Sequence, residues 1–535
     1  MKRHKLKSVN FLFALLVFYR SPAIALNEPT HQIINEEATR QSGLDQILRD
    51  QVRFVEGIQQ SIQGRRVFEW IGEGGIREDD GFRYFNHFHD PLRSWGTAGL
   101  PRLLGTNPSS IRWMQNFSSG WSWQNARDYY WTALTATTSS AREKAFADTF
   151  RALGQVMHLV VDASVPEHVR NDIHPIEGAC RMIGIRCLGN YEYWVSDKHG
   201  LSGSTEETDF MSTYLTSPIG FAPSILQQPT DDSAAPVTVA RLIDTDTYTG
   251  TESGPGVTLS PAIGIGEFAN ANFFSEDTID GSYPFPNVSA LQPSQISVPD
   301  TGKVFRYYKK GMNDGIPNDF AATECVLDQA ARDQGAYSGP TYFCVDEAVW
   351  SRTAQEMLPR AVGYARGVLD YFFRGKVNST FLSPSFTWVE WGTQSNSIRV
   401  DNVNVTVDGT NETGQGTMRL VLLFRGTDSM ETFPPVIVSE PVSVSAGAAQ
   451  TVVFPFSSLP YPATHPPVFG TYSAMYWGIL VYKGSLGQES EAIVADGSCI
   501  NPDGSRFARR YDFQHAIGIT LTSGDWNESA YFEGC

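Results

Sequence analysis

The chain has 535 residues, of which 41 % are hydrophobic and 19 % are charged, and its formal net charge is −17. This length exceeds what one hydrophobic core supports, so we expect two or three domains. The many aromatic residues exclude a wholly disordered chain. The negative charge repels nucleic acid and anionic membranes at long range, and it favours metal cations and neutral or cationic head groups as ligands.

The first 25 residues are typical of a cleavable signal peptide. Four basic residues lie within the first seven, an apolar run spans 11–18, and Ala23–Ala25 has the small-residue cleavage pattern. Removing this segment takes away five basic residues and no acidic one, which moves the net charge from −17 to −22. No later stretch has the roughly 18 consecutive apolar residues of a transmembrane helix. We therefore expect a secreted or periplasmic protein without a transmembrane segment, and its oligomeric state stays open.

Residues 26–375 have the apolar periodicity of a mainly helical domain. The pattern predicts helices over 33–42, 44–63, 121–137, 141–164, 267–274 and 350–373. Gly375 follows the last of these as a helix stop. Serine, threonine, proline and glycine are frequent from residue 200 onwards, which indicates a loop-rich insertion over about 200–342.

Residues 376–535 have short runs of alternating apolar and polar residues instead. These runs predict strands at 397–407, 418–424, 436–438, 450–456 and 479–482, with glycine-containing turns between them. Several strands at such spacing are typical of a β-sandwich. The predicted fold is therefore a helical domain followed by an all-β sandwich.

Six cysteines in an exported chain indicate disulfide bonds. Of the fifteen connectivities, local pairing closes the shortest loops. It joins Cys180 to Cys187, Cys325 to Cys344, and Cys499 to Cys535. Zinc–thiolate sites are the alternative, but no Cys-x-x-Cys motif is present to support them.

His158 and Asp162 are the strongest candidates for a metal site. They are four residues apart within a predicted helix, so both side chains lie on one helix face. Pro166 ends or kinks that helix, which lets the chain fold back and bring His168 near the same site. Imidazole and carboxylate ligands together suit zinc. Taken by itself, such a pair is more often a surface hydrogen bond or a hydrogen-bonded core histidine.

Other histidines and acidic residues of the helical part are further candidates for zinc ligands. His87 comes shortly after an acidic run at 78–80, His31 lies at the start of an early predicted helix, and His174 and Glu192 follow His168. The ordinary interpretations are an aromatic loop beside a solvated acidic turn, and a capped helix with an exposed histidine.

The segments carrying these residues resemble the zinc-dependent phospholipase C and S1/P1 nuclease superfamily, whose helical domain binds a three-zinc cluster. The resemblance covers the helical part, with most of 200–342 extra. It implies a first zinc held by Asp79, His87, His158 and Asp162, a second by His168 and Glu192, and a third by His31 with a bridging Asp162. Asp79 is preferred to Asp80 because its block matches better.

Two positions depart from the family pattern. The family has a histidine four residues before its late glutamate, and here that position is Leu188, so we assign His174 as the substitute ligand. The family's third zinc also uses the amino terminus of the mature chain, well upstream of the histidine. The predicted terminus Leu26 is only five residues from His31. We therefore expect two or three zinc ions.

The resemblance implies an exported zinc-dependent phosphodiester hydrolase, most like a phospholipase C. Asp79 would orient or deprotonate the attacking water, and Tyr84 and Phe85 would form an apolar wall for a head group or base, although ordinary core packing also explains these two rings. The substrate would be a phospholipid or another phosphodiester, with the β-sandwich contacting a membrane surface or a partner. The alternatives are an S1/P1-type nuclease, or a non-catalytic, zinc-stabilised scaffold with an adhesion-type β-sandwich.

Overall fold

The computed structural model combines α-helices with antiparallel sheets. It describes residues 28–52, 54–101, 106–172, 190–200, 203–227, 238–250, 262–294, 306–310, 321–380, 397–425, 433, 436–457 and 475–500. The predicted signal peptide and His174, Cys180, Cys187, Leu188 and Cys535 lie outside these residues. Within the described part, no helix has both the length and the apolar character needed to cross a membrane.

The chain divides into two compact units. The first contains Met1–Gln41, Ile71–Trp123 and Leu153–Val368, and the second contains Ser42–Trp70, Gln124–Ala152 and Leu369–Cys535. Three of the five divisions fall inside the helices α4 (Val67–Arg77), α7 (Ser139–Asp162) and α15 (Glu347–Phe372), and the other two follow Gln41 and Trp123. The domain boundaries drawn from the sequence stay predictions.

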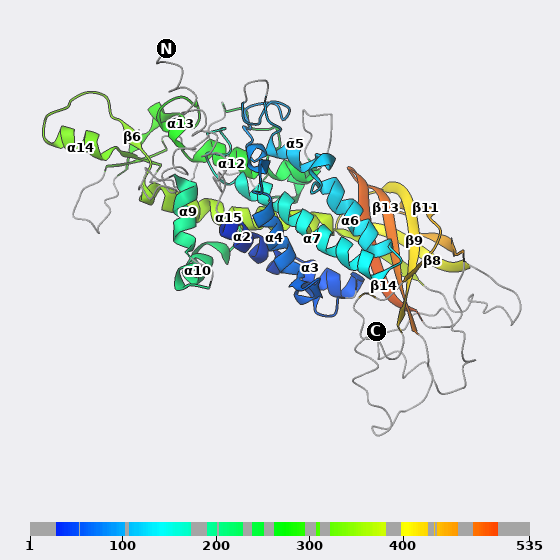
Figure 1. The fold of residues 1–535 in the computed structure, drawn as a ribbon. Helices are drawn as coiled ribbons and strands as arrows, with labels where there is room; N and C mark the ends of the chain where they lie inside the picture. The colour runs from blue at the N-terminus through cyan, green and yellow to red at the C-terminus, as the bar shows by residue number, and fades with distance from the viewer. Residues whose placement is uncertain are drawn as a thin grey trace, which may run out of the picture. The chain divides into compact units, whose positions relative to one another are not determined.

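The first unit is mainly helical (Figure 1). Besides parts of α4, α7 and α15, its helices are α2 (Glu28–Arg40), α5 (Ser110–Met114), α9 (Tyr191–His199), α10 (Thr205–Phe210), α12 (Ile265–Asn272), α13 (Glu276–Ile279) and α14 (Val326–Asp333). The predicted helices 33–42, 141–164, 267–274 and 350–373 correspond to α2, α7, α12 and α15, with ends that differ by a few residues.

Glycines allow α2, α4 and α7 to pack closely. A Cβ at Gly154 of α7 would lie 2.0 Å from the carbonyl oxygen of Ile71 in α4, and one at Gly75 of α4 would lie 3.2 Å from the carbonyl of His31 in α2. Asn35 Nδ2 of α2 donates to the Gly154 carbonyl at 3.0 Å. The three helices therefore approach one another at distances that larger side chains would prevent.

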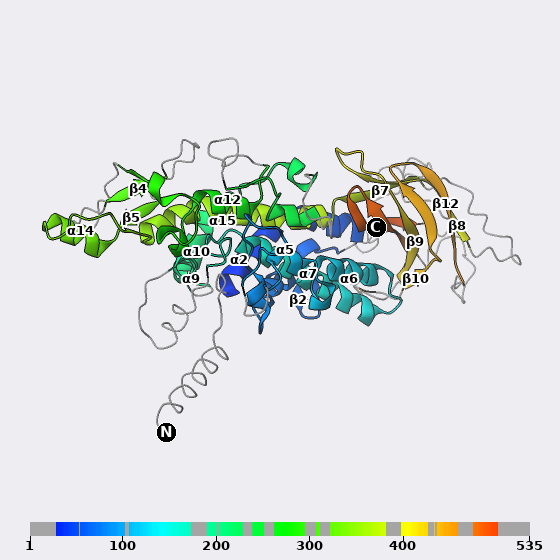
Figure 2. The ribbon, with the colours of Figure 1, turned by 90° about the horizontal axis from the view of Figure 1, so that it is seen from above.

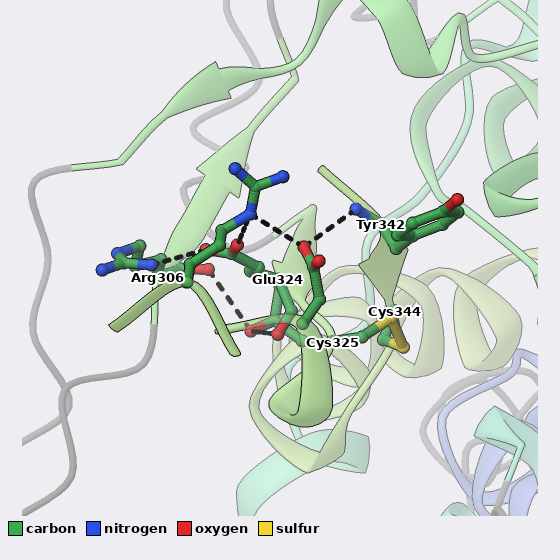
Figure 3. The surroundings of a disulfide bond; sticks show 8 residues. Arg306, Glu324, Cys325, Tyr342 and Cys344 are labelled. Atoms are coloured by element: carbon green, nitrogen blue, oxygen red, sulfur yellow. Dashed lines mark hydrogen bonds and ion pairs between the residues drawn. A yellow bond between two sulfur atoms is a disulfide. The ribbon is translucent and has the colours of Figure 1, made fainter. Parts of the chain in front are cut away.

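The insertion holds a small sheet that the sequence pattern missed. Its antiparallel strands β3 (Gln292–Pro293), β4 (Tyr307–Lys309), β5 (Ala322–Glu324) and β6 (Phe343–Cys344) lie in that order. The predicted Cys325–Cys344 disulfide is confirmed, and it joins the residue after β5 to the end of β6 (Figure 3). Beside it, Arg306 Nη1 pairs with Glu324 Oε2 at 3.0 Å. Strands of two or three residues carry too few alternations to produce a pattern.

The second unit contains the helix α3 (Leu44–Ile47), all but the first residue of α6 (Trp123–Thr135), a two-stranded hairpin and two larger antiparallel sheets (Figure 2). The strands are β7 (Gly375–Thr380), β8 (Ser397–Val407), β9 (Gly414–Arg425), β10 (Val436–Val438), β11 (Val442–Ala446), β12 (Gln450–Pro455), β13 (Met475–Leu486) and β14 (Glu489–Ile500). One sheet has the order β10-β9-β13-β14, with β11 also pairing with β9, and the other has the order β12-β8-β7.

Both sheets contribute to one hydrophobic core. Val405 of β8 and Phe454 of β12 belong to the same buried cluster as Leu420 of β9 and Tyr482 of β13. The expected combination of a helical part and an antiparallel β part is thus confirmed. All five predicted strands are present, whereas β7, β11 and β14 were not predicted.

The prediction of one helix over 44–63 is wrong. After α3 the chain makes a π-helical turn at Leu48–Val52, and a hairpin follows with β1 (Ser61–Ile62) and β2 (Arg65–Arg66). Gly57 and Gln63 have φ values of 57° and 49°, which a right-handed helix cannot contain.

A buried ion-pair network holds α6 against β14 within the second unit. Arg127 of α6 donates through Nε and Nη2 to the two carboxylate oxygens of Glu489 at 2.7 and 2.9 Å, and through Nη1 to the carbonyl of Phe372 at 2.8 Å. Arg374 Nη1 donates to the same carboxylate at 2.7 Å. The buried charges are therefore paired and hydrogen-bonded, as burial requires.

Candidate metal centre

Helix α7 supplies the two central side chains of the candidate site. The apolar residues of its C-terminal half are buried, and the polar pair His158 and Asp162 is fully buried among them. Because the pair is one helical turn apart, His158 Nε2 lies 3.1 Å from Asp162 Oδ2. The helix ends at Asp162, before Pro166, and the following turn places His168 Nδ1 3.7 Å from Asp162 Oδ1.

His31 joins this pair from α2. Its Nε2 lies 3.1 Å from Asp162 Oδ1, and its ring stacks on that of His158 with centroids 3.6 Å apart. Helix α2 begins at Glu28, so His31 lies inside the helix rather than at its start. His31 is therefore a fully buried residue rather than the exposed one of the ordinary interpretation.

His87 and Asp79 reach the same place from the segment after α4. His87 Nδ1 lies 2.8 Å from Asp162 Oδ2 and 3.6 Å from Asp79 Oδ1, and His158 Nε2 lies 3.8 Å from the same Asp79 oxygen. Asp80 is exposed and pairs with Arg77. Two groups able to hold a cation result, namely His31 with His158 and Asp162, and Asp79 with His87 and His158.

His168 and Glu192 form a further buried pair. Glu192 lies in the first turn of α9, where the helix dipole favours an acidic residue, and its Oε2 is 3.7 Å from His168 Nε2. The phenyl ring of Phe88 stacks on His168 with centroids 4.5 Å apart. The expected additional ligand His174 lies outside the described residues, so this pair is placed without it.

The two aromatic residues assigned to a substrate wall lie just before His87, in the 3₁₀ turn Arg83–Asn86. Tyr84 is buried and Phe85 is half-buried, and their ring centroids are 4.2 Å apart. Phe82 stacks on Phe85 at 6.3 Å and is 70 % exposed, so one face of this aromatic group meets solvent.

Burial and mutual charge set the protonation of the cluster. Burial lowers the pKa of His31 to about 3 and that of His87 to about 4. Burial also disfavours the charged form of His158, but Asp162 and Asp79 outweigh it and raise the pKa of His158 to about 10. Burial would raise the pKa of Asp162, yet the surrounding histidines hold it well below its usual range. An ionised carboxylate and two neutral imidazoles, the forms that bind metal, thus meet at neutral pH.

The geometry of Asp162 fits a metal ion better than a hydrogen-bond network. Both of its carboxylate oxygens are buried and lie within 3.1 Å of imidazole nitrogens, yet neither makes a hydrogen bond with any residue that the structure describes. Both ring nitrogens of His31 are likewise buried without a hydrogen bond among those residues. Buried polar atoms normally find partners, so converging lone pairs of this kind form a site that could bind a cation.

The last turn of α4 supports the cluster in a way that the sequence did not reveal. The carbonyl oxygen of Gly75 lies 2.6 Å from His158 Nδ1 and accepts its proton, so Nε2 is the nitrogen that could bind a metal once its own proton is displaced. Carbonyls in the last turn lack intrahelical donors and are available for such a bond. Glu78, three residues further on, is also buried.

A second missed feature lies behind the segment that carries His87. His89 Nε2 is 2.7 Å from Asp244 Oδ2, and the indole nitrogen of Trp95 donates to the same oxygen at 3.0 Å. The backbone N–H of His89 donates to the carbonyl of His168 at 3.0 Å. Asp244 thus anchors the chain immediately after a candidate ligand. Only the three-dimensional structure reveals this, because 155 residues separate His89 from Asp244.

Comparisons with known proteins do not assign the chain to a family. No family model matches it, and no curated protein does. Among solved structures, the alpha-toxin of Clostridium perfringens, isolated from an avian strain, aligns over 91 % of this chain and 94 % of its own, with 11 % identity and a TM-score of 0.26. A TM-score this low does not establish a shared fold. What the described residues define is a protein of helical and β parts with a buried His/Asp cluster that could bind metal.

Proposed function

We propose that this protein is an exported zinc-dependent phosphodiester hydrolase, most like a phospholipase C. The observation that carries the proposal is the convergence of His31, His87 and His158 on the carboxylate of Asp162, with Asp79 beside them. This carboxylate makes no hydrogen bond with any described residue. Clusters of this donor set that hold two or more metal ions serve the hydrolysis of phosphate esters in several enzyme classes. The order of the ligand blocks, which resembles the phospholipase C and S1/P1 nuclease superfamily, supports the same choice.

The residues divide into a first group around Asp162 and a second around Glu192. Asp79, His87, His158 and Asp162 would hold one zinc, His31 and Asp162 another, and His168 with Glu192 a further one. When bound, zinc lowers the pKa of coordinated water towards about 7 and offsets negative charge on a phosphodiester. The side chain of Asp79 is 2 % exposed, and its carboxylate would orient the attacking water and accept its proton.

Charge favours a zwitterionic phospholipid over nucleic acid as the substrate. The formal net charge of −17 opposes the approach of a polyanion, whereas a choline head group carries its own cation. The exposed ring of Phe82 and the partly exposed ring of Phe85, close to His87, offer an apolar and aromatic surface to such a head group. Single-stranded nucleic acid is the second candidate, because bases also stack on aromatic rings.

We place the protein outside the cytoplasm and assign surface contact to the β part. The basic, apolar N-terminal segment and the Cys325–Cys344 disulfide support export. The two-sheet part of the second unit would bind a membrane or a partner through its surface, while the first unit holds the candidate metal centre.

The test is hydrolysis by the full chain after zinc loading. We expect zinc-loaded protein to release the phosphorylated head group from phosphatidylcholine vesicles, and chelation to abolish this release. Cleavage of single-stranded DNA instead would select the nuclease. Failure on both substrates would refute both enzymatic proposals, and fewer than two zinc ions per chain would favour the structural scaffold.

A further inference from the structure

The two ring nitrogens of His87 face different surroundings. Nδ1 lies 2.8 Å from Asp162 Oδ2, 3.2 Å from His158 Nε2 and 3.6 Å from Asp79 Oδ1, so it points into the candidate metal centre. Nε2 is buried and makes no hydrogen bond with any described residue, and Glu78 Oε1 is 3.9 Å away from it. Nδ1 is therefore the ligand atom of His87.

A histidine that ligates through Nδ1 carries its proton on Nε2. In a buried site this N–H requires an acceptor, because leaving a buried donor unpaired costs its full desolvation free energy. Metal-bound histidines commonly donate this second N–H to a carboxylate, which fixes the tautomer and the ring orientation. The carboxylate of Glu78 lies on the correct side of the ring to accept it.

Glu78 is itself held in place. Its side chain is 1 % exposed, Arg83 Nη2 donates to Oε2 at 2.6 Å, and the indole nitrogen of Trp113 donates to Oε1 at 2.6 Å. Arg83 is anchored in turn by Gln155 Oε1 at 2.9 Å. These donors orient the carboxylate towards His87, and a shift of about 1 Å would bring Oε1 within hydrogen-bond distance of Nε2.

We propose that Glu78 is the positioning residue for His87: it accepts the Nε2 proton and thereby presents Nδ1 to the metal. This inference rests on the metal centre of the proposed function. Residues 75–79 would then supply both the ligand Asp79 and the acceptors for two ligand imidazoles. The acceptor for His87 is Glu78, and the acceptor for His158 is the Gly75 carbonyl. Arg83 and Trp113 act behind Glu78 and do not touch the candidate ligands in the described contacts.

The variant that tests this role is Glu78→Gln, with Glu36→Gln as its matched control. Both changes keep the size of the side chain and replace a carboxylate by an amide, but Glu36 lies on α2 and pairs with Gln32 at 2.8 Å and Arg40 at 2.7 Å. We expect Glu78→Gln to weaken zinc binding to the full-length protein by about 10- to 100-fold in a competition titration with a chelator. Glu36→Gln is expected to leave the zinc affinity near the wild-type value.

Two further readouts separate positioning from stability. The melting temperatures of the metal-free variants report any loss of stability, and the visible absorption bands of the cobalt-loaded protein report the ligand geometry. We expect the cobalt bands to move in Glu78→Gln and to stay in place in Glu36→Gln. If Glu78→Gln had the same zinc affinity and the same cobalt bands as the wild type, the proposed role of Glu78 would be overturned while the metal centre would stand. A wild-type protein that binds neither zinc nor cobalt would overturn the proposed function and this inference together.

Discussion

Replacement of His158 by alanine is expected to abolish high-affinity metal binding. His158 is the residue shared by the two groups that can hold a cation within the described part of the chain. Its Nε2 lies 3.1 Å from Asp162 and 3.8 Å from Asp79, so both groups lose a ligand in His158→Ala.

The magnitude follows from the number of ligands. Zinc binding by a four-ligand protein site is worth about 10–16 kcal/mol, or about 3 kcal/mol for each ligand. A loss of about 3 kcal/mol raises the Kd by about two orders of magnitude. Zinc at 100 times the wild-type Kd stabilises the wild type by about 2.7 kcal/mol, and it would stabilise the variant by only about 0.4 kcal/mol.

The assay is the zinc-induced rise in melting temperature, measured on each protein against its own metal-free form. His199→Ala is the control, because His199 is also a buried histidine of the first unit but pairs with Glu207 at 3.6 Å instead of the cluster. We expect the zinc-induced rise to vanish in His158→Ala and to persist in His199→Ala. An equal rise in both variants would refute the assignment of His158.

Three other perturbations test the packing and the electrostatics. Gly154→Val is expected to destabilise the protein by about 1–3 kcal/mol and to weaken zinc binding, because the new Cβ would lie 2.0 Å from the Ile71 carbonyl; unchanged melting and zinc affinity would contradict the close packing of α4 and α7. Burial raises the pKa of Asp244 from its usual value of 3.8 to about 7, so between these two pH values the folded chain binds more protons than the unfolded chain and stability falls as the pH rises. The melting temperature of Asp244→Asn should therefore rise relative to that of the wild type as the pH increases through this window. A difference in melting temperature that stays constant with pH would contradict the raised pKa. Arg127→Met leaves Glu489 with one fewer partner in a buried site and is expected to cost about 3–5 kcal/mol in chemical denaturation, whereas a cost below 1 kcal/mol would show that the pair is dispensable.

Local patterns predicted those features that depend on neighbouring residues. The spacing of His158 and Asp162 in an apolar helix was sufficient to place both side chains on one face of α7. The alternating run 397–407 likewise predicted β8 with its observed bounds. In both cases the signal lies within a few turns or one strand of sequence.

Long-range contacts required the structure. Nothing in the sequence predicted that the Gly75 carbonyl contacts His158 or that Gly154 contacts Ile71, because these contacts depend on how three separate helices pack. Within the acidic run 78–80, only the resemblance of the block favoured Asp79 over Asp80. The end of α4 separates them by pointing Asp79 and Glu78 inwards and leaving Asp80 in solvent.

A zinc titration of the metal-free, full-length protein that records bound zinc and phosphatidylcholine hydrolysis in the same samples tests the proposed function directly. We expect hydrolysis to be absent without metal, to rise as zinc binds, and to reach its maximum at two or three zinc ions per chain. Protein that binds this number of zinc ions and still hydrolyses neither phosphatidylcholine nor single-stranded DNA would refute the proposed zinc-dependent hydrolase.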